Sequence, residues 1–153
     1  SYLANQGKTP TGKRLPFEPG RTPTRQAPRL AVMVDVSGSV EDAVLERFAV
    51  EIDAISRRTG AALTVIIGDD AIRSVHHPKP GASGLETLSF EGGGGTDFTP
   101  LLEEADRHHP DLGIVLTDLD GPARFEPPWP VLWAIPVADR HRSAPFGRKL
   151  VID

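Results

Sequence analysis

The most informative segment of the chain is Leu30–Val40, which reads L-A-V-M-V-D-V-S-G-S-V. Its first half, Leu30–Val34, has the length and the β-branched content of a fully buried strand. Asp35, Ser37 and Ser39 follow at the carboxyl end of this strand, and the glycine between the serines allows a sharp turn that brings the two hydroxyls together. Three oxygen ligands on one tight loop suit a hard cation such as Mg²⁺ better than zinc.

Ser39 also has an interpretation that needs no metal. A serine followed three residues later by an acidic residue, here Asp42, is typical of a helix N-cap. The helix would be Glu41–Arg58, in which apolar side chains recur at spacings of four, four and three: Val44, Phe48, Ile52 and Ile55. The two roles of Ser39 are compatible, because the N-terminus of this helix would lie beside the loop in either case.

Strands and helices are predicted to alternate along the rest of the chain. Buried strands are predicted at Ala61–Gly68, Leu112–Leu116 and Val131–Val137, an edge strand at Ala71–His76, and short strands at Leu88–Phe90 and Lys149–Ile152. A second helix is predicted to have Thr99 as its N-cap and Pro100 in its first position, and to run to about His108. This alternation predicts an α/β fold with a mainly parallel sheet, in which ligands bind beyond the carboxyl ends of the strands.

Four consecutive glycines, Gly92–Gly95, lead into Thr96 and Asp97. A glycine run allows a close approach of the backbone to a ligand. A phosphate-binding loop is one interpretation, but the G-K-[ST] signature that should follow is missing. The other two interpretations are a flexible hairpin loop and a metal-binding loop that provides the Thr96 hydroxyl as a ligand.

A third candidate loop, T-D-L-D-G, follows the predicted strand Leu112–Leu116 and contains Asp118 and Asp120. D-L-D-G resembles the D-x-D-G-T motif of haloacid-dehalogenase phosphotransferases. Pro122 stands where the threonine should be, and the remaining chain has no room for the downstream lysine and acidic motifs of those enzymes.

The three loops together resemble, in order, the metal-ion-dependent adhesion site of the von Willebrand factor A (vWA) fold. D-x-S-G-S at Asp35–Ser39 is similar to the first motif, G-G-G-G-T-D-F at Gly92–Phe98 to the second, and Asp118 to the third. The third motif departs from the family pattern, because Leu119 replaces the usual glycine. Asp118 is the preferred metal ligand of this loop, and Asp120 is the alternative. The later segments P-P-W-P-V-L-W and F-G-R resemble a bacterial vWA-like family of unknown function, typically found C-terminal to a metallopeptidase-like domain.

This resemblance implies a reduced three-layer α/β domain over residues 29–153, with a mainly parallel central sheet and helices on both faces. Residues 1–28, rich in proline and basic side chains, would be a linker or wrapping arm from a preceding domain. The serines would bind the metal through their hydroxyls, the threonine directly or through water, and the aspartates mainly through bound waters. The implied ligands of Mg²⁺ (or Mn²⁺ or Ca²⁺) are Asp35, Ser37, Ser39, Thr96 and Asp118.

The implied function is a metal-dependent protein–protein interaction without catalytic activity. The metal would accept a carboxylate from a protein partner, for which a MoxR-type AAA+ ATPase is a candidate. The alternatives are an accessory domain of a metallopeptidase or hydrolase, and a vWA scaffold that has lost metal binding. A formal net charge of −4 gives no support for a nucleic-acid partner. The sequence has no apolar stretch of membrane-spanning length and no signal-peptide pattern, so we expect no membrane contact and a cytoplasmic location.

The histidines and tryptophans have simpler interpretations. His76–His77 and His108–His109 are adjacent pairs without the i, i+4 spacing of a helical zinc motif, and each pair stands beside a proline. We expect both pairs to be solvated in surface turns. Trp133 is expected in the core and Trp129 at an edge of the sheet.

Overall fold

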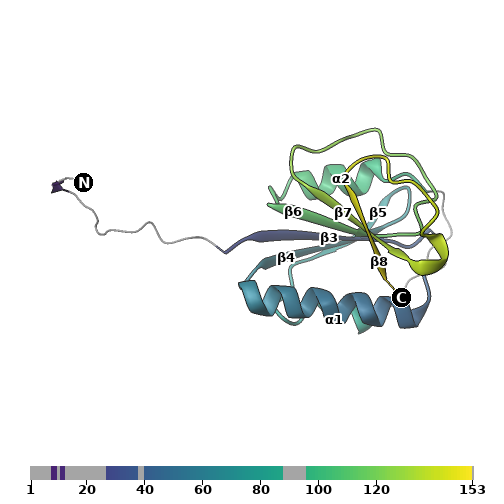
Figure 1. Ribbon diagram of the computed structural model, residues 1–153, viewed down its shortest axis with the longest axis horizontal. Helices are drawn as coiled ribbons and strands as arrows, with labels where there is room; N and C mark the ends of the chain where they lie inside the picture. Colours follow the sequence, from purple (N-terminus) through teal and green to yellow (C-terminus); the bar gives the residue numbers. More distant parts are fainter. Residues whose placement is uncertain (1–7, 10, 13–26, 38–39, 88–95, 153) are drawn as a thin grey trace.

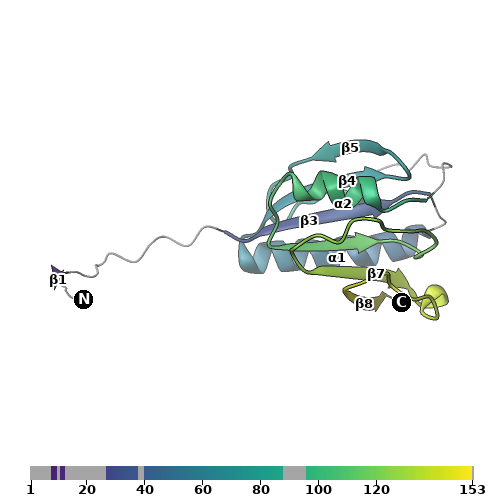
Figure 2. The ribbon, with the colours of Figure 1, turned by 90° about the horizontal axis from the view of Figure 1, so that it is seen from above.

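Strand β3 (Arg29–Asp35) lies in the middle of a six-stranded sheet with the order β5-β4-β3-β6-β7-β8. The structure is a computed structural model that describes residues 8–9, 11–12, 27–37, 40–87 and 96–152. The other strands of this sheet are β4 (Ala62–Gly68), β5 (Ile72–His76), β6 (Leu112–Leu116), β7 (Val131–Pro136) and β8 (Arg148–Ile152). All neighbours pair in parallel except β5, which is antiparallel to β4 and forms one edge (Figure 2). The mainly parallel sheet and the edge position of β5 are therefore confirmed.

The register of the central strands fixes where the candidate ligands lie. Val34 of β3 pairs with Leu116 of β6, so the next residues, Asp35 and Thr117, follow side by side. On its other side β3 pairs with β4, and Val36 donates its backbone N–H to the Gly68 carbonyl at 2.9 Å. The loops that follow these parallel strands therefore gather at one edge of the sheet.

Helix α1 (Asp42–Thr59) covers one face of the sheet (Figure 1). It packs through Phe48 and Ile52, with Leu45 and Ala49 beside them, against the side chains that β3, β4 and β6 present on this face. The helix ends at Gly60, whose φ of 68° is the left-handed conformation of a glycine C-cap. The predicted N-cap is wrong, because the helix begins at Asp42 and its N-cap is Glu41, without a side-chain hydrogen bond.

Helix α2 (Thr99–Asp106) covers the opposite face, where Leu101, Leu102 and Ala105 are fully buried (Figure 1). The three-layer arrangement with helices on both faces is therefore confirmed. Thr99 is the first helical residue and not the N-cap, which is Phe98, and the helix stops two residues short of the predicted His108.

The remaining described elements are short. They are the 3₁₀ turns η1 (Leu85–Thr87) and η2 (Val137–Asp139), and the antiparallel pair β1 (Lys8–Thr9) and β2 (Thr11–Gly12). This pair falls in a segment for which the sequence predicts no strand. The strand predicted at Leu88–Phe90 lies outside the described residues. Within the part of the chain that is described, no helix is long and apolar enough to cross a membrane.

Trp133 is fully buried, as expected, whereas Trp129 covers a central strand and not an edge. The Trp129 ring lies directly over Gly113 of β6, and its Nε1 donates to Asp106 Oδ1 at 2.9 Å. A Cβ atom at position 113 would overlap the indole and would lie 3.0 Å from Met33 Cε. The tryptophan thus fills the space that the glycine leaves on the α2 face.

We expect Gly113→Ala to lower the free energy of unfolding by about 1–3 kcal/mol, the usual cost of overfilling a packed core. Urea denaturation followed by circular dichroism measures the change. The double variant Gly113→Ala/Trp129→Leu is the control, because removing the indole should relieve most of the clash. Equal costs of Gly113→Ala in both backgrounds would contradict this explanation.

Candidate metal centre

The Asp35 carboxylate is the centre of the predicted site and is almost completely buried, with 2% of its surface exposed. Its Oδ1 accepts hydrogen bonds from the backbone N–H of Ser37 at 3.0 Å and from the Ser37 hydroxyl. Its Oδ2 accepts a hydrogen bond from the Thr117 hydroxyl at 2.7 Å. Asp35 therefore fixes the first loop and joins it to the end of β6.

The second predicted loop reaches the same place through Thr96, whose hydroxyl contacts the hydroxyl of Ser37. Thr96 is held there by the loop that follows β6. A Cβ atom on Gly121 would lie only 2.8 Å from Thr96 Cβ, so this close approach requires glycine at position 121. Further along, Phe98 donates its backbone N–H to the Pro122 carbonyl at 2.9 Å.

An ion pair supports this contact between the second and third loops. Arg124 Nη1 donates to Asp97 Oδ2 at 2.6 Å, and the backbone N–H of Arg124 donates to Thr99 Oγ1 at 2.9 Å. Thr99, expected to cap its own helix, therefore accepts a hydrogen bond from the neighbouring loop.

Leu119 stands where the family pattern has glycine, yet its backbone has a conformation that is typical of glycine. Its φ is 63°, in the left-handed region that glycine adopts without cost, and its backbone N–H donates to Thr117 Oγ1 at 3.1 Å. The side chain is buried against the α2-face core, with 7% of the residue exposed. The strain of about 1–2 kcal/mol is comparable with the 1.5–3 kcal/mol that leucine burial contributes, so the loop can keep its shape without glycine.

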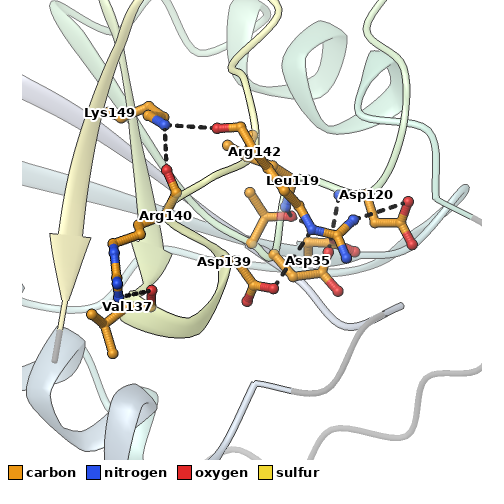
Figure 3. Close-up of polar contacts among 10 residues, drawn as sticks. Asp35, Leu119, Asp120, Val137, Asp139, Arg140, Arg142 and Lys149 are labelled. Atoms are coloured by element: carbon orange, nitrogen blue, oxygen red, sulfur yellow. Dashed lines mark hydrogen bonds and ion pairs between the residues drawn. The ribbon is translucent and has the colours of Figure 1, made fainter.

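The two aspartates of the third loop have different surroundings. Asp118 is half-buried, and its Oδ1 accepts the backbone N–H of Asp120 at 3.1 Å. The Asp120 side chain is 73% exposed and pairs with Arg142 Nη1 at 3.3 Å (Figure 3). Of the two, Asp118 lies close enough to Asp35 to affect its ionisation.

Burial raises the pKa of Asp35 above its ordinary value. The hydrogen bonds from Ser37 and Thr117 oppose this increase, and the negative charge of Asp118 adds to it. Two carboxylates that repel one another beside two hydroxyls form an oxygen-only donor set, which a hard cation would stabilise. The donors that the structure describes therefore fit Mg²⁺ or a similar ion.

Of the five predicted ligands, the structure brings together Asp35, Ser37, Thr96 and Asp118, while Ser39 lies outside the described residues. Within the described ranges, no group of three or more His, Cys, Asp or Glu side chains is arranged to hold a metal. Thr117 was not predicted, although its position next to Asp35 follows from the parallel pairing of β3 with β6. Arg142 was not predicted either, since nothing in the sequence connects this residue with Asp120.

Asp69, at the end of β4, belongs to a separate interaction. Its buried carboxylate accepts hydrogen bonds from Arg73 Nη2 at 2.6 Å, from Arg73 Nε at 3.2 Å and from the backbone N–H of Ala71 at 3.1 Å. The Arg73 guanidinium lowers the pKa of Asp69 to about 2, although burial acts in the opposite direction. Asp69 therefore stabilises the turn between β4 and β5.

A fold with three loops gathered at the carboxyl edge of a parallel sheet is that of a vWA-like domain. Residues 30–153 match the family described as "VWA-like domain (DUF2201)", and the chain belongs to this family. A protein of Thermotoga maritima described as "Uncharacterized protein" is 33% identical over 92 residues, which are 60% of this chain and 23% of that protein. The chain thus matches less than a quarter of the length of this curated relative.

Exchanges at Leu119 test whether its backbone is strained. We expect Leu119→Ala to cost about 2–3 kcal/mol through lost burial. We expect Leu119→Gly to be about 1 kcal/mol more stable than Leu119→Ala, because glycine adopts the positive φ without strain. Chemical denaturation measures both variants. Leu102, inside α2, is the matched control, because there the glycine variant should be less stable than the alanine variant. If the alanine variant is the more stable one at both positions, the backbone of Leu119 is not strained.

The Asp69–Arg73 pair predicts a change in stability at acid pH. The pKa of Asp69 in the folded protein, about 2, lies below the ordinary value of 3.8, so its contribution is present above about pH 4 and is lost as the pH falls toward 2. Between pH 5 and about 2, the difference in Tm between the wild type and Asp69→Asn should therefore shrink. Glu126→Gln, an exchange of an exposed carboxylate outside this pair, serves as the control. A difference that stays constant over this range would contradict the prediction.

Proposed function

We propose that this domain is a metal-dependent protein-interaction module whose ligands are Asp35, Ser37, Ser39, Thr96 and Asp118. Mg²⁺ is the expected cation, with Mn²⁺ or Ca²⁺ as substitutes. Ser39 is included because of the family resemblance alone. The other four residues are included because of the resemblance and because of their arrangement in the structure. A protein partner would supply an acidic residue, and a MoxR-type AAA+ ATPase is a candidate for this partner.

The observation that carries the proposal is the contact between the Ser37 and Thr96 hydroxyls beside the Asp35 carboxylate. These groups come from two loops that are 59 residues apart along the chain. Asp118 of the third loop is near enough for its negative charge to raise the pKa of Asp35. This set of oxygen donors supports a site for a hard cation.

The residues of the proposed site have different roles in binding the cation. Asp35 is buried, and its hydrogen bonds orient the Ser37 and Thr117 hydroxyls. A bound cation supplies a positive charge with open coordination positions, and neutral hydroxyl ligands leave much of that charge available to a partner carboxylate. Asp118 is more exposed than Asp35 and can hold bound water on the solvent side.

Arg142 adds a fixed positive charge at the rim of the site. It is held between Asp120, at 3.3 Å, and Asp139, whose Oδ1 lies 3.6 Å from Nε (Figure 3). Lys149 Nζ donates to the carbonyls of Arg140 and Arg142 at 2.8 and 2.7 Å, which keeps this loop in place. Because two carboxylates already neutralise Arg142, the attraction for an acidic partner would come from the bound cation and not from this rim.

The second candidate function is an accessory domain of a metallopeptidase or hydrolase. It is favoured by the length of the Thermotoga maritima relative, in which the matched segment is 23% of the chain. In that setting the same cation site would bind the partner domain or the substrate protein, and the remaining part of the longer protein would perform the chemistry.

Calorimetric titration with Mg²⁺ and Mn²⁺ tests the site. We expect weak binding, with Kd on the order of 10⁻⁴–10⁻³ M, because few charged groups would contact the ion directly. Asp35→Asn should weaken binding about 10- to 100-fold, since it removes the charge that orients the hydroxyl ligands. The fold should remain intact in this variant, because burial in the folded state already disfavours the charged form of Asp35.

Asp70→Asn, an exposed aspartate exchange next to Asp69 at the same edge of the sheet, is the matched control and should bind as the wild type does. If the metal binds, a pull-down with Mg²⁺ and with chelator identifies the partner. Equal affinities of the wild type and Asp35→Asn, or no binding by either, would refute this site.

A further inference from the structure

Two histidines that are 31 positions apart along the chain meet at the amino edge of the sheet, opposite the candidate metal centre. His77 follows β5, next to Thr64 near the start of β4, and His108 follows α2. The centres of their rings are 5.3 Å apart, with an angle of 57° between the ring planes. One histidine of each adjacent pair thus faces a histidine of the other pair.

Each of these rings has one nitrogen fixed by a neighbour. Glu104 Oε2 lies 3.0 Å from His108 Nε2, and when Nε2–H donates this hydrogen bond, the lone pair of the neutral ring is on His108 Nδ1. Thr64 Oγ1 lies 3.4 Å from His77 Nδ1. In the part of the chain that is described, His77 Nε2 and His108 Nδ1 make no hydrogen bond, so each ring keeps one nitrogen that can bind a ligand.

The distance between the rings fits a shared metal ion. Two imidazoles bound to one tetrahedral zinc, with Zn–N bonds of about 2.0–2.1 Å, have ring centres about 5 Å apart. The observed separation is 5.3 Å. A carboxylate on the far nitrogen of a metal-binding histidine, as Glu104 provides for His108, is the usual way to orient such a ligand.

The space around the rings can hold the remaining ligands. Both histidines line an open hollow of about 370 Å³, together with Thr64, Pro78 and Pro110. A water molecule occupies about 30 Å³ of liquid, so several waters fit there. Arg29 also lines the hollow, and Asp111, whose Oδ2 accepts the Arg29 backbone N–H at 2.8 Å, adds a negative charge at the same edge.

We propose that His77 and His108 form a second cation site, which binds a divalent transition metal of the zinc class with water completing its coordination. Glu104 is the positioning residue for His108. The described residues offer no third His, Cys, Asp or Glu ligand, so this is a two-histidine site, weaker than a structural zinc centre. It goes beyond the proposed function, because its nitrogen donors select a softer ion than the oxygen site does.

The test is a Zn²⁺ titration of the untagged 153-residue chain, by calorimetry and by NMR of the imidazole nitrogens, in saturating Mg²⁺. His77→Gln and His108→Gln should each weaken Zn²⁺ binding at least tenfold, and Glu104→Gln about tenfold. The NMR shifts should be confined to His77 Nε2 and His108 Nδ1.

The adjacent histidines provide matched controls. His76→Gln and His109→Asn should change Zn²⁺ affinity less than about twofold; asparagine is chosen because it tolerates the positive φ of 51° at position 109. Asp35→Asn should leave Zn²⁺ binding unchanged, which separates this site from the proposed Mg²⁺ site. Equal losses in the controls and in the His77 and His108 variants, or no Zn²⁺ binding by the wild type, would overturn the proposal.

Discussion

The buried carboxylate of Asp35 is the group on which the arrangement of the carboxyl edge depends. It receives hydrogen bonds from Ser37 in its own loop and from Thr117 at the end of the neighbouring strand β6. A buried charge is tolerated only when such partners surround it, and the raised pKa of Asp35 shows that they compensate incompletely. The geometry of the first loop and the affinity that we propose for a cation thus have the same physical origin.

Much of the fold could be predicted from the sequence, because its central strands are buried on both faces and read as continuous apolar runs. Leu112–Leu116 was predicted to the residue, and the order of the six strands of the main sheet and of the two α-helices was right. The helix starts were less accurate, since Ser39 and Thr99 have good capping side chains but the helices begin after Glu41 and Phe98. Here tertiary contacts prevailed over local capping: the Thr99 hydroxyl accepts a hydrogen bond from Arg124.

The candidate site was partly predictable. Asp35, Ser37 and Thr96 could be named because their motifs are local, whereas Thr117 and Arg142 depend on strand register and on contacts between distant loops. The paired rings of His77 and His108 could not be predicted for the same reason, since each histidine looks like an ordinary surface residue in its own segment. Leu119 shows the opposite case, in which an unexpected residue keeps the expected loop shape because its side chain is buried.

The hydrogen bond between Asp35 and Thr117 also has a consequence for how the protein folds. It joins residues 82 positions apart, and β3 cannot pair with β6 until most of the chain has been synthesised. Closing so long a loop costs entropy before any contact compensates for it, and parallel sheets of this kind fold slowly for that reason. The carboxyl edge is therefore assembled late, and the cation that we propose there would stabilise the finished domain without nucleating its folding.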